Sequence, residues 1–144
     1  MIKPVLALAA AAAFAAPAAI ASANAPAVHF VTPKAGATTG TSVSFKVALK
    51  NFSLDPADVG KRNKPHRGHL HFQMDGGKYD YPKYSGPNGN LAKTLGIAGK
   101  YSPSIAPVIT YKHLSAGSHT LTVFLANNDH SAEGAKATIH FTVR

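Results

Sequence analysis

Strict alternation of apolar and polar residues dominates the chain after residue 27, and it constrains the fold more than any other feature. In SVSFKVALKNF (42–52), Val43, Phe45, Val47 and Leu49 fall on one side and mostly polar residues on the other. The segments HTLTVFLAN (119–127) and AKATIHFTVR (135–144) repeat the pattern. A period of two belongs to a strand with one buried face, whereas an amphipathic helix has a period of 3.6. The sequence therefore predicts an all-β chain.

Shorter segments complete the expected set of strands: VHFVTP (28–33), HLHFQM (69–74), GKYDY (77–81) and VITYK (108–112). About seven short antiparallel strands with glycine-rich turns between them favour an immunoglobulin-like antiparallel sandwich, with a jelly roll or a small barrel as alternatives. One long loop, rich in Gly, Pro and Tyr, is expected over 82–107, where Asn90 is predicted to cap a single helical turn.

The N-terminal segment has the pattern of a signal peptide. Lys3 precedes an apolar run rich in alanine, and Ala21-Ser22-Ala23 offers small side chains to the peptidase. We expect a signal peptide over 1–23 and a single β-sandwich domain over 24–144, exported as a secreted or periplasmic protein. A retained membrane anchor is disfavoured because the apolar run is short and Pro17 interrupts it. No membrane span is expected after processing.

Composition limits the chemistry open to this chain. The chain has no cysteine, so disulfides, thiolate ligands and cysteine nucleophiles are excluded. Its net charge of +9 predicts attraction to an anionic cell-envelope polymer or to another protein. The basic residues are scattered except in GKRNKPHR (60–67), so nucleic acid is not an expected partner. No activated nucleophile or carboxylate pair is evident, and we expect a monomeric binding domain rather than an enzyme.

Three of the eight histidines lie close together in HRGHLHFQMDGG (66–77). On a strand, Leu70, Phe72 and Met74 would face the core, while His69 and His71 would share the outer face about 6 to 7 Å apart. At that spacing two imidazoles can converge on one ion. The alternative is that both rings are solvated or hydrogen-bonded on a wet face.

A second polar group, LANNDH (125–130), strengthens the metal-site interpretation. If the 69–74 and 119–126 strands pair antiparallel, the end of one lies beside the start of the other. This pairing brings Asp129 and His130 toward His69 and His71, with His66 nearby. The competing interpretation is an ordinary turn in which Asn127 and Asp129 make Asx-type hydrogen bonds and His130 bonds backbone.

Imidazole and carboxylate ligands suit Zn(II) or Cu(II). The site is expected to centre on His69, His71 and His130, with Asp129 assisting. Cuprous copper is less favoured, because the parity of Met74 directs its sulfur inward. His119 begins its strand at the opposite end and is expected to bond or pack in its own turn.

A different binding function is suggested by tyrosines that border the long loop. Tyr84 and Tyr101 could stack on a sugar ring of a cell-wall glycan or contact a protein. The two hypotheses differ in their pH dependence. Metal binding should respond to pH through the histidines, whereas aromatic stacking should barely change between pH 5 and 8.

Three segments, GHLHFQMDGG (68–77), LSAGSHTLTVFLANNDH (114–130) and ATIHFTV (137–143), carry a resemblance to a family. Over roughly 66–144 the chain resembles uncharacterised exported bacterial β-sandwich domains with a G-H-x-H strand and a later G-x-H-x-L-x-V-x-L strand that ends in an acidic-His turn. The resemblance implies export and a β-sandwich, with no established activity. It also implies that His119 belongs with His69, His71 and His130. Leu70 stands where some relatives have a third histidine.

Overall fold

The computed structural model describes residues 23–77 and 101–144, and these residues form an all-β fold of two sheets. Strands account for 57% of the described residues and no α-helix occurs among them, which confirms the all-β part of the predicted fold class. The strands are β1 Ala27–Thr32, β2 Thr38–Thr39, β3 Val43–Lys50, β4 Ser53–Leu54, β5 Arg67–Met74, β6 Ser102–Ser104, β7 Val108–Tyr111, β8 Gly117–Asn127 and β9 Ala132–Val143. Two short 3₁₀ turns, η1 Pro56–Asp58 and η2 Asp75–Gly77, precede and follow β5.

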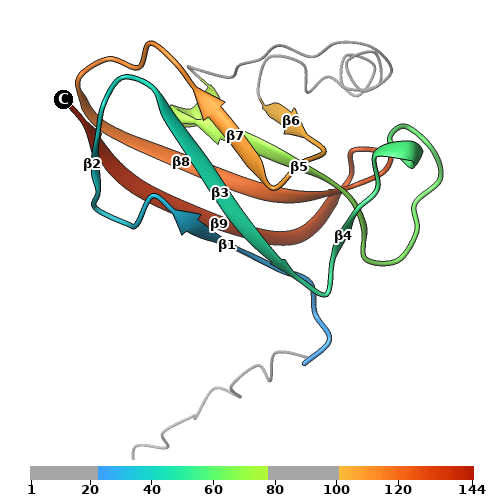
Figure 1. Ribbon diagram of the computed structural model, residues 1–144. Coiled ribbons are helices and arrows are strands. Elements are labelled where there is room, and N and C mark those ends of the chain that lie inside the picture. The colour runs from blue at the N-terminus through green and yellow to red at the C-terminus, as the bar shows by residue number, and fades with distance from the viewer. Residues whose placement is uncertain (1–22, 78–100) are drawn as a thin grey trace, which may run out of the picture.

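The two sheets differ in size and curvature (Figure 1). The smaller sheet has the order β1-β3-β7, and both of its pairings are antiparallel. The larger sheet has the order β2-β9-β8-β5-β4, with β6 also paired to β5, and it curls into a half-barrel. Its long β8–β9 and β5–β8 pairings are antiparallel, whereas the two-residue strands β2 and β4 pair parallel to β9 and β5.

The core lies between the sheets and is filled by the residues that alternate inward. Phe45 of β3 packs edge-to-face on Tyr111 of β7 and on Phe141 of β9. Leu70, Phe72 and Met74 of β5 are fully buried on the same side. The inward assignment of these apolar side chains, made from parity, is therefore confirmed, and the hydrophobic effect acting on this face fixes the register of the strands.

The structure departs from expectation around the long loop. Residues 102–104, expected inside that loop, form β6 against the edge of β5. Residue 77, expected to open a strand, closes the 3₁₀ turn η2. The rest of the expected 77–81 strand, the helical turn after Asn90, and Tyr84 lie outside the described residues, as does most of the expected signal peptide. Within the described residues, no helix has the length and apolarity needed to cross a membrane.

Candidate metal site

Strand β5, which carries two of the site's histidines, lies very close to β8 beside the site. Residue 68 pairs with Asn127, and a Cβ added at Gly68 would lie 1.9 Å from the carbonyl oxygen of Ala126. Only glycine fits at this distance, so Gly68, the glycine of G-H-x-H, permits the close contact beside His69. The antiparallel β5–β8 pairing predicted from the sequence is confirmed, with His69 opposite Ala126 and His71 opposite Phe124.

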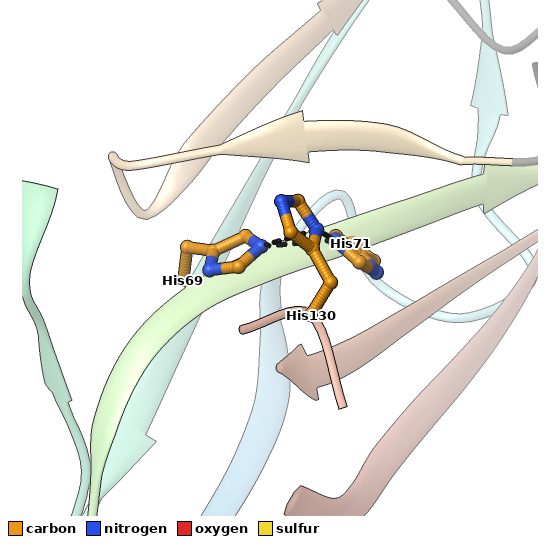
Figure 2. Close-up of side chains that lie close together, drawn as sticks. All are labelled: His69, His71 and His130. Atoms are coloured by element: carbon orange, nitrogen blue, oxygen red, sulfur yellow. Dashed lines mark hydrogen bonds between the residues drawn. The ribbon is translucent and has the colours of Figure 1, made fainter. Parts of the chain in front are cut away.

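Three imidazole nitrogens converge at this end of the sheet (Figure 2). His69 Nε2 lies 2.9 Å from His71 Nε2 and 3.1 Å from His130 Nδ1, and the latter two are 2.8 Å apart. His69 and His71 extend from β5, whereas His130 reaches over from the β8–β9 turn. These residues, the His triad, could together hold a metal ion.

Hydrogen bonding alone cannot satisfy the His triad when its rings are neutral. In a neutral imidazole each nitrogen is either an N–H donor or a lone-pair acceptor. Among three mutually contacting nitrogens at least two must have the same role, so at least one contact sets two lone pairs or two N–H groups against each other. A cation removes this conflict, because all three nitrogens then direct lone pairs at it.

The size of the triangle also suits a metal ion bound from one side. The point equidistant from the three nitrogens lies about 1.7 Å from each, inside the roughly 2.0–2.1 Å expected for zinc–nitrogen bonds. An ion at the proper bond length would therefore lie about 1 Å out of the nitrogen plane. All three ligands would approach from one hemisphere of the ion.

The outer face of β5 is buried, contrary to the alternative of a wet face. His69 is 0% and His71 5% exposed, and His130 is 7% exposed. Tyr101, just before β6, stacks on His71 with ring centroids 5.2 Å apart, and Phe124 packs edge-on against Tyr101. The β8–β9 turn covers the other side through His130. The histidines therefore occupy a second, smaller interior on the far side of the sheet from the main core.

Burial keeps the two strand histidines neutral. Burial, followed by repulsion from His130, lowers the pKa of His69 to about 3. Burial, followed by repulsion from His69 and His130, lowers the pKa of His71 to about 3. Metal ligation requires neutral imidazole, so these rings are ready to bind an ion at pH 7. At these two residues, protons therefore compete with a metal ion only well below pH 5.

The turn that carries His130 is held by two asparagines that the sequence analysis did not assign. The side-chain amide of the fully buried Asn128 donates to the backbone carbonyl of Arg62, and the backbone carbonyl of Asn128 accepts from Gly60 N. Asn63 Oδ1 accepts from the backbone N–H of Asp129 at 3.0 Å. These bonds support His130 in a left-handed conformation with φ of 67°. In the sequence, this support was indicated only by the two adjacent amides of LANNDH, Asn127 and Asn128.

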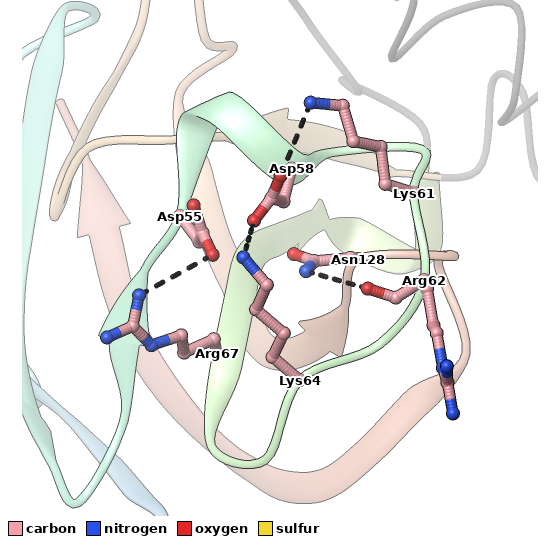
Figure 3. Close-up of polar contacts among 7 residues, drawn as sticks. All are labelled: Asp55, Asp58, Lys61, Arg62, Lys64, Arg67 and Asn128. Atoms are coloured by element: carbon pink, nitrogen blue, oxygen red, sulfur yellow. Dashed lines mark hydrogen bonds and ion pairs between the residues drawn. The ribbon is translucent and has the colours of Figure 1, made fainter.

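The loop over 60–67 that receives these bonds is itself tied down by ion pairs (Figure 3). Asp58 accepts from both Lys61 and Lys64, and these two bonds lower the pKa of its carboxyl. Arg67 lies 3.9 Å from the largely buried Asp55. The basic run at 60–67 is thus partly neutralised by Asp55 and Asp58, which precede it, and the loop supports the β8–β9 turn.

Asp129 and His66 do not join the His triad. The exposed Asp129 accepts from Ser131 N at 2.9 Å, and the bonds from Ser131 lower the pKa of its carboxyl. This is the Asx-type turn that was the competing interpretation. His66 is exposed and its Nδ1 lies 3.0 Å from the carbonyl of Asn51. Neither residue is among those whose ligand atoms gather within 4.8 Å in the described part of the chain.

His119 lies apart from the His triad, although the resemblance groups them. It is the inward-facing residue at the start of β8, stacked on Phe141. Its Nδ1 lies 2.6 Å from a carboxylate oxygen of Asp75 and its Nε2 lies 2.7 Å from the carbonyl of Ser115. Both partners accept, so with Asp75 ionised only an imidazolium can donate to both. This ring has no lone pair to offer a metal.

Of the two tyrosines proposed for ligand recognition, Tyr84 lies outside the described residues. Tyr101 has one ring face against His71, and that face is closed to a sugar or peptide. In the described structure Tyr101 is therefore part of the cover over the His triad.

Comparison with known proteins adds little to this description. No protein-family model and no curated protein sequence matches the chain. Among solved structures, it is similar to the endo-beta-1,4-mannanase from Thermotoga petrophila, with a TM-score of 0.42 and 11% identity over 83% of this chain. The chain spans only 20% of the length of that mannanase. Similarity at this level gives no information on what the chain binds.

Proposed function

We propose that this protein binds one divalent metal ion, Zn(II) or Cu(II), through His69 Nε2, His71 Nε2 and His130 Nδ1. The observation that carries the proposal is the convergence of these nitrogens to within 3.1 Å of one another in a buried pocket. When the three rings are neutral, at least one of the three nitrogen–nitrogen contacts is repulsive, whereas one cation accepts all three lone pairs. The proposed role is binding, not catalysis.

The donor set favours metals that accept imidazole nitrogen. Zinc and copper do so, whereas magnesium and calcium prefer oxygen. Among residues 23–77 and 101–144 no thioether supports cuprous copper, since the sulfur of Met74 lies in the main core. Asp129, expected to assist, is not needed as a direct ligand. Its negative charge near His69 acts at longer range, where it favours a cation.

Calorimetric titration of chelator-stripped, tag-free protein with Zn(II) and Cu(II) at pH 7.5 tests the proposal. We expect one ion per chain at submicromolar affinity, and a loss of at least about 1,000-fold in the His69→Ala/His71→Ala double variant. His140→Ala is the matched control, because His140 is an exposed histidine of β9 bonded to Thr120. Equal affinity in the double variant and the control contradicts the proposal.

We further propose that the domain works after export, as a monomer, and that its sandwich is immunoglobulin-like. The signal-peptide pattern over 1–23 supports export. The strand order supports the topology: β1-β3-β7 corresponds to the A-B-E strands of an immunoglobulin domain, and β9-β8-β5 to G-F-C. In the periplasm or outside the cell, histidine ligands have an advantage over thiolates, because they do not oxidise to disulfides.

A further inference from the structure

We infer that the metal-loaded His triad takes a small monoanion as its fourth ligand, in the cavity bordered by Tyr101. This inference rests on the proposed metal-binding function and adds the chemical class of the ligand. The anion would be of one to three heavy atoms, in the class of hydroxide, halide, cyanide and azide.

The first observation is the one-sided arrangement of the ligands. Because the nitrogen triangle is too small for a coplanar ion, all three imidazoles approach from one hemisphere and leave the other open. Three-histidine zinc sites in proteins keep a fourth position for water or another exogenous ligand. A fourth ligand from the described chain is absent, since only the three histidines gather there.

The second observation is the charge of the site. Three neutral imidazoles leave a divalent ion with its full charge of two in a pocket where each histidine is at least nine-tenths buried. An uncompensated buried charge is strongly unfavourable. Asp129 supplies only part of the balance, because its carboxylate turns outward to bond Ser131 and acts on His69 at longer range. A bound monoanion would halve the net charge of the centre.

The third observation is a cavity directly beside the ligands. It measures about 110 Å³ and is bordered by His71 and His130 of the triad, with Tyr101, Phe124, Ala126 and Ala132 among its apolar walls. A cavity of this size has room for a ligand of a few atoms. Ala132 is exposed at the rim, which gives small solutes a way in. The basic surface of the protein favours anions on approach.

Azide and Cu(II) provide the test. The purified protein is loaded with one equivalent of Cu(II), and azide is added while the azide-to-copper charge-transfer absorption is followed. We expect one azide per copper with saturable binding, and at least tenfold weaker binding of acetonitrile, a neutral molecule of the same size. Ala132→Leu fills the cavity and should weaken azide binding at least tenfold while Cu(II) affinity stays within about twofold. Ala116→Leu, an exposed alanine in the turn before β8, is the matched control and should change neither.

The outcomes separate this inference from the proposal on which it rests. If Cu(II) binds but azide gives no charge-transfer band, or if Ala132→Leu leaves azide affinity unchanged, the fourth-ligand inference is overturned and metal binding stands. If Cu(II) does not bind to the protein, the proposed function fails and the inference falls with it.

Discussion

Two buried histidine sites on neighbouring strands of one sheet differ in their protonation. In the His triad, His69 and His71 lie on the outer face of β5 against a third imidazole, and burial lowers the pKa of both to about 3. At the other end of the sheet, His119 faces inward between the acceptors Asp75 and Ser115, where it must donate from both nitrogens. Burial is common to both sites, so the chemistry of the partners decides whether a ring is a ligand or a cation.

The two histidine sites cannot exchange roles, because only one of them contains a counter-charge. The triad presents lone pairs and no counter-charge, which suits an incoming cation. His119 already has its counter-charge in Asp75, whose other oxygen accepts from Thr120 N at 2.8 Å. That bond fixes the carboxylate at the end of β5, so the His119–Asp75 pair joins β5 to β8 as a structural tie.

The largest expected effect is a loss of stability in acid, caused by the triad. The folded pKa of about 3 for His69 and His71 lies below the ordinary 6.5 of the unfolded chain, so the unfolded state binds more protons. The free energy of unfolding should therefore be constant above about pH 7 and fall as pH drops toward 3, by about 4 kcal/mol at pH 5 for the two rings together.

Urea unfolding of metal-free protein between pH 8 and 5 measures this loss. In the His69→Gln/His71→Gln variant the part due to these rings should vanish, and only the pH dependence of the other groups should remain. The same slope in the variant and the parent would show that the triad is not buried in the neutral form.

The second-largest loss of stability is expected at the His119–Asp75 pair. Asp75→Ala leaves the buried imidazolium of His119 without its counter-charge and should lower the free energy of unfolding by about 3 kcal/mol. Zinc affinity should stay within about twofold, because the His triad does not use this pair. A loss of stability well under 1 kcal/mol would contradict a buried imidazolium paired with Asp75. A large loss of zinc affinity would show that the two sites are not independent.

Gly68→Ala should have an intermediate effect. The new methyl would collide with the carbonyl of Ala126, so β5 and β8 must separate beside His69. We expect a loss of about 2 kcal/mol in the free energy of unfolding, together with weaker zinc binding. Gly134→Ala is a suitable comparison: a Cβ there meets nothing within 4 Å, although φ of 107° strains it, so it tests backbone strain without a collision. Unchanged zinc affinity in Gly68→Ala would contradict the close β5–β8 approach.

The smallest effect is expected from the support of His130. Asn63→Ala removes the acceptor for Asp129 N and should cost about 1 kcal/mol of stability. Metal affinity should fall about tenfold, as is typical for groups that orient a ligand. Lys112→Ala, at an exposed lysine just after β7 in the smaller sheet, is the control and should leave metal affinity unchanged. Equal affinities in these two variants would remove Asn63 from the support of the site.

The sequence predicted the parts of this molecule that depend on regular alternation. Parity placed Leu70, Phe72 and Met74 in the core and His69 with His71 on the other face, and antiparallel pairing placed His130 nearby. The burial of that second face was not predictable, because Tyr101 and the β8–β9 turn cover it from segments without a regular pattern. Local hydrogen bonds to Ser131 turned Asp129 away, and parity carries no information on such bonds.

The pairing of His119 with Asp75 was also not predicted from the sequence. The two residues are separated by 44 positions, and no sequence pattern connects them. Their contact depends on the register of β5 against β8, in which Met74 lies opposite Leu121. Antiparallel pairing alone puts the end of one strand beside the start of the other, but the contact between these two side chains requires the register as well.

Long-range ¹H–¹⁵N spectra of the histidine side chains distinguish the neutral ligand rings that we expect in the triad from the cation that we expect at His119. Spectra are recorded at pH 7 before and after one equivalent of Zn(II). We expect His69 Nε2, His71 Nε2 and His130 Nδ1 to shift on zinc binding, while His119 shows two protonated nitrogens in both spectra. Triad nitrogens that ignore zinc, or a neutral His119 that responds to it, would contradict this distinction.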